Sequence, residues 1–148
     1  MPTARQRFDV TIGRSISLFG MAEHWNNSCP SLPKETENPD FYNDIGRAGV
    51  VLAVAAMDAY FTKKFEEIII PYLKKKGATP ELTTLLQAAG LDVAQALELV
   101  TMARPFRRIK SLIESHLDRY TTQKFESIDS LFKSVGLPKL SVTIQQNS

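Results

Sequence analysis

Apolar residues recur along this chain at intervals of three and four positions, which is the spacing of amphipathic helices. The strongest pattern lies between about Asp44 and Ile70. Its apolar stripe consists of Val50, Val54, Met57, Phe61, Phe65 and Ile68. Three further apolar residues lie beside this stripe: Val51, Ala55 and Tyr60. An arc this wide predicts one long central helix, about 44–70, that other helices contact on several sides. Pro71 predicts a kink or a stop at its end.

The remaining segments predict shorter helices with recognisable ends. We expect these helices at about 4–25, 81–90, 92–103, 105–120 and 123–136. Asp92 and Pro105 each open a helix, and Gly90 and Gly136 each close one. The residues predicted to face inward in the last three are Val93, Ala96, Leu97 and Val100, then Phe106, Ile109, Ile113, Leu117 and Tyr120, then Phe125, Ile128, Leu131 and Phe132. The predicted fold class is all-α, a bundle of about five to six helices.

Length and loop composition predict one domain. A chain of 148 residues can bury enough surface to fold without metals or disulfides. Prolines and asparagines concentrate in residues 26–41, which we interpret as a loop longer than most helix connections. Residues 138–148 are expected to form a poorly structured tail. Residues 1–148 are therefore predicted to form a single all-α domain with one long loop.

Charge and cysteine content narrow the class of protein. The 18 basic and 16 acidic residues give a formal charge of +2, far from the strong basic excess of dedicated nucleic-acid binders. Cys29 is the single cysteine, so neither an internal disulfide nor a cysteine-rich metal site is expected. The longest apolar run, Gly49 to Met57, is too short to span a bilayer. These features predict a soluble cytoplasmic protein with no cofactor, no metal and no membrane contact.

Two charged residues stand out in the predicted central helix. Arg47 and Asp58 are separated by about three helical turns, which places them on the same face, where they could flank a polar cleft. A carboxylate among apolar residues is costly to bury unless it is paired or hydrogen-bonded. Asp58 therefore has two interpretations. It is either an acidic residue that orients a catalytic arginine or histidine, or a structural group that caps a neighbouring helix or pairs with a basic side chain.

The densest basic cluster consists of Arg104, Arg107, Arg108 and Lys110, and it surrounds Phe106 in the sequence. We interpret it as a candidate RNA-binding site, because the cations can pair with phosphates while an aromatic ring stacks on a base. The alternative is a solvated basic face, with Phe106 in the core beside Ile109. A second basic run, Lys74–Lys76, needs no ligand, since lysines at a helix C-terminus complement the helix dipole.

Two segments resemble the RiboL-PSP-HEPN-like group of the HEPN superfamily. RAGVVLAVAAMDAYF, from Arg47 to Phe61, is similar to that group's first core helix, and FESIDSLFKSVGL, from Phe125 to Leu137, is similar to a later helix followed by Gly-Leu. The resemblance implies an all-α bundle, a homodimer, and a place in RNA-linked defence or toxin-antitoxin systems. It also implies that catalysis would require an Arg-x4-6-His motif. The positions that this motif requires before His24 and His116 hold no arginine.

The function predicted from the sequence is therefore a non-catalytic HEPN-like domain that acts through protein or RNA contacts, as a homodimer. Two alternatives remain open. One is a metal-independent RNase whose Arg-x4-6-His motif lies in a missing C-terminal part. The other is a helical adaptor or dimerisation module with no connection to RNA.

Overall fold

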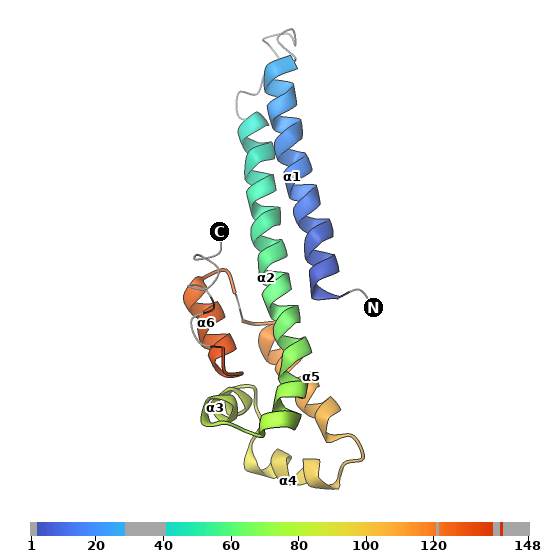
Figure 1. Cartoon of the computed structure of the whole chain (residues 1–148), viewed down its shortest axis with the longest axis vertical. Coiled ribbons are helices and arrows are strands. Elements are labelled where there is room, and N and C mark those ends of the chain that lie inside the picture. The colour runs from blue at the N-terminus through green and yellow to red at the C-terminus, as the bar shows by residue number, and fades with distance from the viewer. Residues whose placement is uncertain (1–2, 29–40, 121, 138–139, 141–148) are drawn as a thin grey trace. The chain divides into compact units, whose positions relative to one another are not determined.

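The computed structural model describes residues 3–28, 41–120, 122–137 and 140, and within them it contains six α-helices and no strand. Figure 1 shows these helices: α1 (Ala4–Ser28), α2 (Phe41–Lys76), α3 (Pro80–Ala88), α4 (Val93–Thr101), α5 (Pro105–Leu117) and α6 (Phe125–Lys133). The predicted all-α class and the helix number are confirmed. The connection between the first two helices is shorter than the predicted loop at both ends, because α1 runs to Ser28 and α2 begins at Phe41. Its residues 29–40, and the predicted tail apart from Leu140, lie outside the described residues.

Helix α2 is longer than the sequence predicts. It continues through Pro71 to Lys76, so of the two alternatives at Pro71 the stop is wrong, and the kink stays a prediction. A proline inside a helix removes one backbone hydrogen bond, and the full burial of Ile69, which is 0% exposed, helps to hold the helix in place there. The helix ends where the lysines complement its dipole and Gly77 takes a φ of 76°, a conformation that suits glycine.

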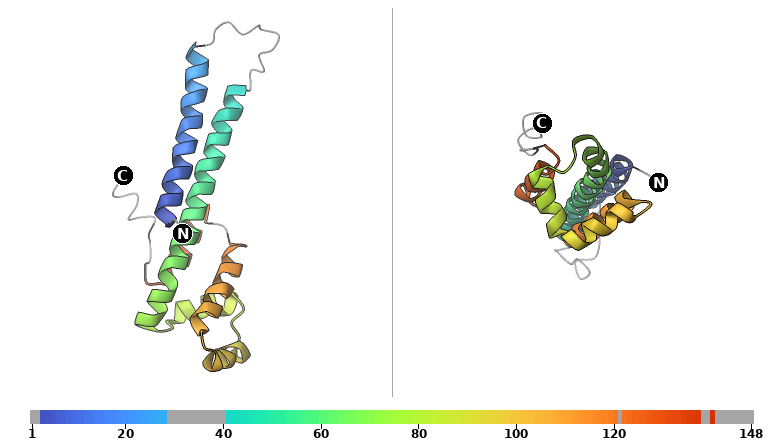
Figure 2. Two further views of the ribbon diagram at one scale, coloured as in Figure 1. Left: turned by 90° about the vertical axis from the view of Figure 1, so that its right-hand side faces the viewer. Right: turned by 90° about the horizontal axis from the view of Figure 1, so that it is seen from below.

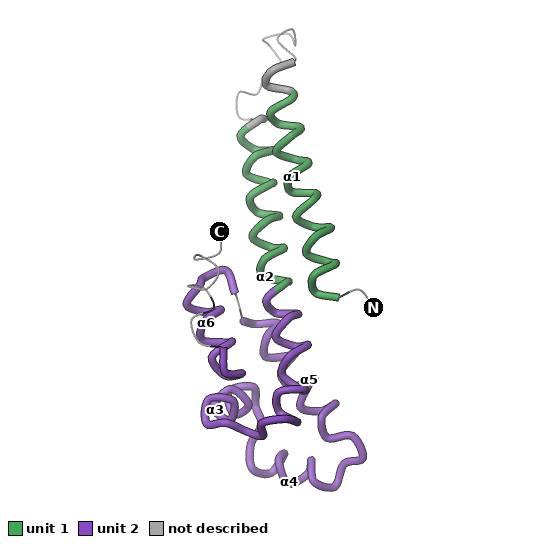
Figure 3. The backbone as a smooth tube through the Cα atoms, in the orientation of Figure 1, with its two compact units in different colours: residues 1–60 green, residues 61–148 purple. Residues whose placement is uncertain are grey.

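The chain divides into two compact units, residues 1–60 and 61–148, and Figure 3 distinguishes them by colour. Helix α2 contributes its N-terminal part to unit 1 and its C-terminal part to unit 2. The expectation of a single domain, and that of a central position for this helix, stay predictions. Each unit is described by itself.

Unit 1 is an antiparallel hairpin of α1 and the N-terminal part of α2, which lie side by side in Figures 1 and 2. The hydroxyl of Ser15 donates a hydrogen bond of 2.8 Å to the carbonyl oxygen of Gly49. Gly49 leaves room for the ring of Phe19, since a Cβ atom at position 49 would lie 2.9 Å from that ring. The buried residues in the described part of unit 1 are all small: Ala4, Ser15, Gly49 and Ala56. Unit 1 therefore holds its helices close together without a core of large side chains.

Unit 2 has a core of large side chains. The rings of Phe61 and Phe65 on α2 pack edge-on against Phe132 on α6, with centroid distances of 6.0 Å and 5.7 Å. Helices α3 to α6 contribute buried leucines and isoleucines, namely Leu82, Leu86, Leu99, Ile109, Ile113, Leu117, Ile128 and Leu131. Helix α5 contacts both α3 and α4. Burial of this many large apolar residues makes unit 2 the main source of hydrophobic stabilisation among the described residues.

Capping residues fix the short helices of unit 2. Asp92 accepts a hydrogen bond of 2.7 Å from the backbone N–H of Gln95 at the start of α4, and Thr79 caps α3 through Leu82. Pro105 occupies the first turn of α5. These contacts satisfy backbone donors that a helix start leaves unpaired. The predicted helix starts at Asp92 and Pro105 are thus confirmed.

Several predicted inward faces are wrong. On α4, the predicted residues Val93, Ala96, Leu97 and Val100 are all exposed, and Leu99 is the buried residue. Phe106 and Phe125 are also exposed, at the first turns of α5 and α6. The later residues of these two stripes are buried, except Tyr120, which is half-buried. The physical reason is that a short helix packs on one side only, so an apolar stripe on another side stays uncovered. Val50, Val51 and Ala55, predicted to lie within the apolar arc of the long helix, are exposed as well.

Candidate interaction surfaces

One face of the α1–α2 hairpin carries exposed apolar side chains. On α1, Ile12, Ile16 and Phe19 recur at positions i, i+4 and i+7, and Val50, Val54 and Met57 repeat this spacing on α2. Ile16 is 65% exposed, Phe19 42% and Val50 53%. The other three are half-buried. We call these six residues the hairpin face.

The two stripes lie on the same side of the hairpin. Ser15 and Gly49 mark the line where the helices touch. Ile16 follows Ser15 by one position and Val50 follows Gly49 by one, so each is turned by about 100° in the same sense about its own helix axis. Because the helices run antiparallel, equal turns bring both residues to the same side of the hairpin (Figure 2). The hairpin face is therefore one continuous surface.

Packing in unit 2 joins two basic runs that are distant in the sequence. The ammonium group of Lys74, in the last turn of α2, lies 4.9 Å from the ring centre of Phe106, in the first turn of α5. The lysine run at the end of α2 is therefore beside the arginine-rich start of α5. We call this region the basic patch, and it consists of Lys74, Lys75, Lys76, Arg104, Phe106, Arg107, Arg108 and Lys110. All but Lys110 are exposed.

The predicted RNA-binding residues thus acquire neighbours that the sequence did not indicate. Phe106 is 37% exposed, so its ring lies at the surface rather than in the core, and Lys74 makes a cation–π contact with it. Lys110 is partly neutralised by Glu114, whose carboxylate lies 3.4 Å from its ammonium group. The remaining cations of the basic patch belong to the two helix ends that meet at this accessible ring. Such a combination suits phosphate groups together with an unpaired base.

The predicted polar pair is not brought together. Arg47 forms an exposed ion pair of 3.1 Å with Asp44, one turn earlier on α2. Asp58 is half-buried farther along the same helix. A separation of three turns corresponds to about 16 Å along the helix axis, too far for both groups to contact one small reacting centre. The role of Arg47 and Asp58 as a candidate site stays a prediction.

The histidine that the sequence placed nearest to the basic cluster has a local neighbour. His116 is half-buried in the last turn of α5, and its ring centroid lies 6.0 Å from that of Tyr120. A basic side chain at this end of a helix complements the dipole. In the part of the chain that the structure describes, no group of three or more His, Cys, Asp or Glu residues is placed to hold a metal ion.

One helix of the described residues, Asn43–Lys76, is long and apolar enough to cross a membrane by length and composition alone. This is weak evidence, because core helices of soluble proteins pass the same test. Only 17% of its most apolar stretch is buried. Farther along the helix, Phe65 and Ile69 are fully buried in unit 2, and crossing a bilayer would require them to leave that core.

The chain matches no family model, no curated protein and no solved structure in the comparisons. The fold defines the class as all-α. The segments that carry the HEPN resemblance are helical: residues 47–61 lie within α2, and residues 125–137 contain α6 and the turn at Gly136. Membership of the HEPN superfamily is a proposal.

Proposed function

We propose that this chain is a non-catalytic, HEPN-like interaction domain that works as a cytoplasmic homodimer joined through the hairpin face. The observation that carries the proposal is the exposure of Ile16, Phe19 and Val50, at 65%, 42% and 53%, above a hairpin that buries only small residues in its described part. Two hairpins packed face to face form a four-helix bundle, which buries stripes at i, i+4 and i+7 on all four helices.

The whole side of the hairpin that carries the hairpin face is large enough for such a dimer. Helix α1 has 25 residues, which at about 1.5 Å each gives a length of about 38 Å, and two helices side by side are about 20 Å wide. The resulting area of about 750 Å² is close to the roughly 800 Å² that each partner buries in a stable interface. A second copy therefore offers a surface of the right size and shape.

The charges near the two ends of the hairpin face also permit self-association. Arg5 pairs with Asp9 at 3.0 Å near one end, and Arg47 pairs with Asp44 at 3.1 Å near the other. Each pair is neutral, so two hairpins meet without bringing these like charges together unpaired. An apolar centre with a polar rim is the usual arrangement of protein interfaces.

The test is the molar mass in solution, measured by size-exclusion chromatography with light scattering over a range of concentrations. We expect a dimer for the native chain and a monomer for Ile16→Asp, because the aspartate would be buried unpaired at the centre of the interface. Val10→Asp is the matched control, since Val10 is 58% exposed on another side of α1 and should leave the dimer intact. A native chain that stays monomeric at all concentrations would refute the proposal.

The basic patch supports a second function, contact with single-stranded RNA. The specific observation is the cation–π contact between Lys74 and Phe106, which joins two basic runs around an exposed ring. The wider role in RNA-linked defence or toxin-antitoxin systems rests on the HEPN resemblance alone. The RNase alternative would need an Arg-x4-6-His motif in a longer chain, and no arrangement of the described residues favours it.

Binding of labelled single-stranded RNA at low and high salt tests this second function. We expect salt-sensitive binding that weakens in Arg107→Ala/Arg108→Ala, with a shallower salt dependence because fewer phosphates are neutralised. Arg7→Ala/Arg14→Ala removes the same charge from exposed positions of unit 1 and serves as the control. Equal loss of binding in both double variants, or binding that ignores salt, would favour an adaptor with no connection to RNA.

A further inference from the structure

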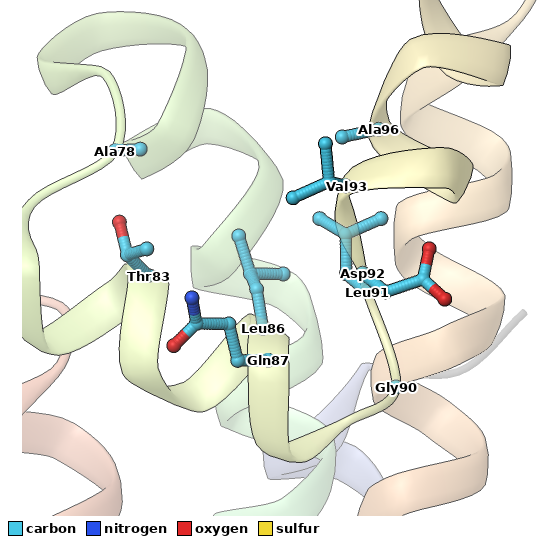
Figure 4. Close-up of a pocket in the computed structure, with 9 residues that line it drawn as sticks. All are labelled: Ala78, Thr83, Leu86, Gln87, Gly90, Leu91, Asp92, Val93 and Ala96. Carbon is cyan, nitrogen blue, oxygen red and sulfur yellow. The ribbon is translucent and has the colours of Figure 1, made fainter.

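Unit 2 has an apolar groove between α3 and α4. It has a volume of about 650 Å³, within the range of known ligand pockets. Figure 4 shows Leu86 on α3 and Val93 on α4 on its two sides, with Gly90 and Leu91 in the connection between the helices. The groove is open to solvent, so an extended ligand could lie in it.

An exposed apolar stripe continues the groove along α4. Val93, Leu97 and Val100 recur at i, i+4 and i+7 and are 78%, 67% and 83% exposed. Leu99, the buried residue of α4, lies on another side of this helix. The stripe extends over about 10 Å, two helical turns. That length exceeds what one small molecule in the groove would cover, and it equals the spacing at which a second helix presents its own apolar side chains.

The charge around the groove identifies the kind of helix that fits. The sequence has no lysine or arginine from position 77 to 103, although the chain contains 18 of them. The charged residues in this stretch are Glu81, Asp92 and Glu98, all acidic and all exposed. The charged side chains that α3, α4 and the connection between them contribute are thus all acidic, which is electrostatically complementary to a helix with basic flanks. The lysine run Lys74–Lys76 of the basic patch precedes Ala78, which lines the groove.

We propose that the α3–α4 groove and the stripe on α4 bind a basic amphipathic helix of a partner protein. The partner helix places apolar side chains at i, i+3 or i+4, and i+7 against Leu86, Val93 and Leu97. Its lysines or arginines lie toward the acidic residues of α3 and α4. This site is separate from the hairpin face and from the basic patch, so it adds a protein partner to the proposed function.

The direct test is fluorescence anisotropy with a set of labelled synthetic helices. The probes are two-to-four-turn peptides with leucines at helical spacing and lysines elsewhere. Each is compared with a scrambled peptide of the same composition and with a peptide that carries glutamates in place of the lysines. We expect the basic amphipathic peptides to bind, and both comparison peptides to bind at least about tenfold more weakly.

Two variants locate the site. Leu97→Asp should weaken binding by about tenfold or more, because it places a charge at the centre of the stripe. Ser111→Asp makes the same charge change at an exposed position of α5 that does not line the groove, and it should leave binding unchanged. Circular dichroism confirms that both variants fold, which is expected because both positions are exposed.

Four results would overturn the proposal. One is the failure of every basic amphipathic peptide to bind, and another is equal binding of the acidic or scrambled peptides. A third is a change of oligomeric state in Leu97→Asp, which would assign the stripe to a second copy of this chain. The last is binding of vesicles containing anionic lipid that depends on Leu97 while the peptides do not bind, which would assign it to a membrane surface.

Discussion

Replacing Phe132 by alanine should remove more stability than any change at an exposed phenylalanine. Phe132 is 1% exposed, and its ring packs against those of Phe61 and Phe65 at 6.0 Å and 5.7 Å. Truncation of a buried phenylalanine costs about 3–5 kcal/mol, which combines the lost transfer free energy with the cavity left behind. The whole free energy of unfolding of a domain is about 5–15 kcal/mol, so the variant should be close to the limit of folding.

The assay is thermal and urea unfolding followed by circular dichroism. For a chain of this size, 1 kcal/mol corresponds to about 2–4 °C in Tm, so Phe132→Ala should lower Tm by roughly 6–20 °C. Phe125→Ala is the matched control on the same helix. Phe125 is 46% exposed, so its loss should cost only about 1 kcal/mol, roughly half of what full burial of a phenylalanine contributes.

Comparing these two variants tests the structure against the sequence prediction, because the sequence predicted that both phenylalanines face inward and the structure buries only Phe132. If Phe125→Ala and Phe132→Ala lowered Tm by similar amounts, the packing described for α6 would be refuted. A double-mutant cycle with Phe65→Ala adds a finer test. The aromatic contact between Phe65 and Phe132 should give a coupling free energy of about 0.5–1.5 kcal/mol beyond the area that each residue buries.

Four further changes are checked by unfolding measurements, and two of them should lower stability while the other two should raise it. Gly136→Ala should destabilise the chain by about 1–2 kcal/mol because Gly136 has a φ of 76°, whereas Gly13→Ala, in an open helical position, should stabilise it by about 0.5–1 kcal/mol. Asp92→Ala should cost about 1 kcal/mol because it removes the cap of α4. Pro71→Ala should raise stability by up to about 3 kcal/mol, since it restores a backbone donor inside α2, and an unchanged Tm would contradict this reasoning.

The sequence predicts helix identity well because the relevant signals are local. Asp92, Pro105 and Gly136 act on the backbone within a few residues, and the structure uses each of them where expected. Pro71 is the exception, because its cost is one hydrogen bond, and the packing of Ile69 in unit 2 favours continuation of the helix. Tertiary packing can therefore override a local helix-breaking signal when that signal costs little free energy.

The sequence predicts surfaces poorly because apolar spacing does not say which stripes are covered. The stripe on α4 that contains Val93 and Leu97 has the regular spacing of a core face, yet α4 buries Leu99 and leaves that stripe exposed. The contact of Lys74 with Phe106 joins residues from two helices, and no local pattern indicates it. The candidate sites depend on tertiary packing, whereas their residue types are visible in the sequence.

The close approach of Phe19 to Gly49 limits which pairs of residues those two positions can hold. A methyl group at position 49 would lie 2.9 Å from the ring, so the ring would have to swing outward. Among homologous sequences, a large residue at position 19 should therefore occur with glycine at position 49, and a side chain at 49 should occur with a smaller residue at 19. This covariation gives a criterion for recognising relatives whose overall similarity has been lost.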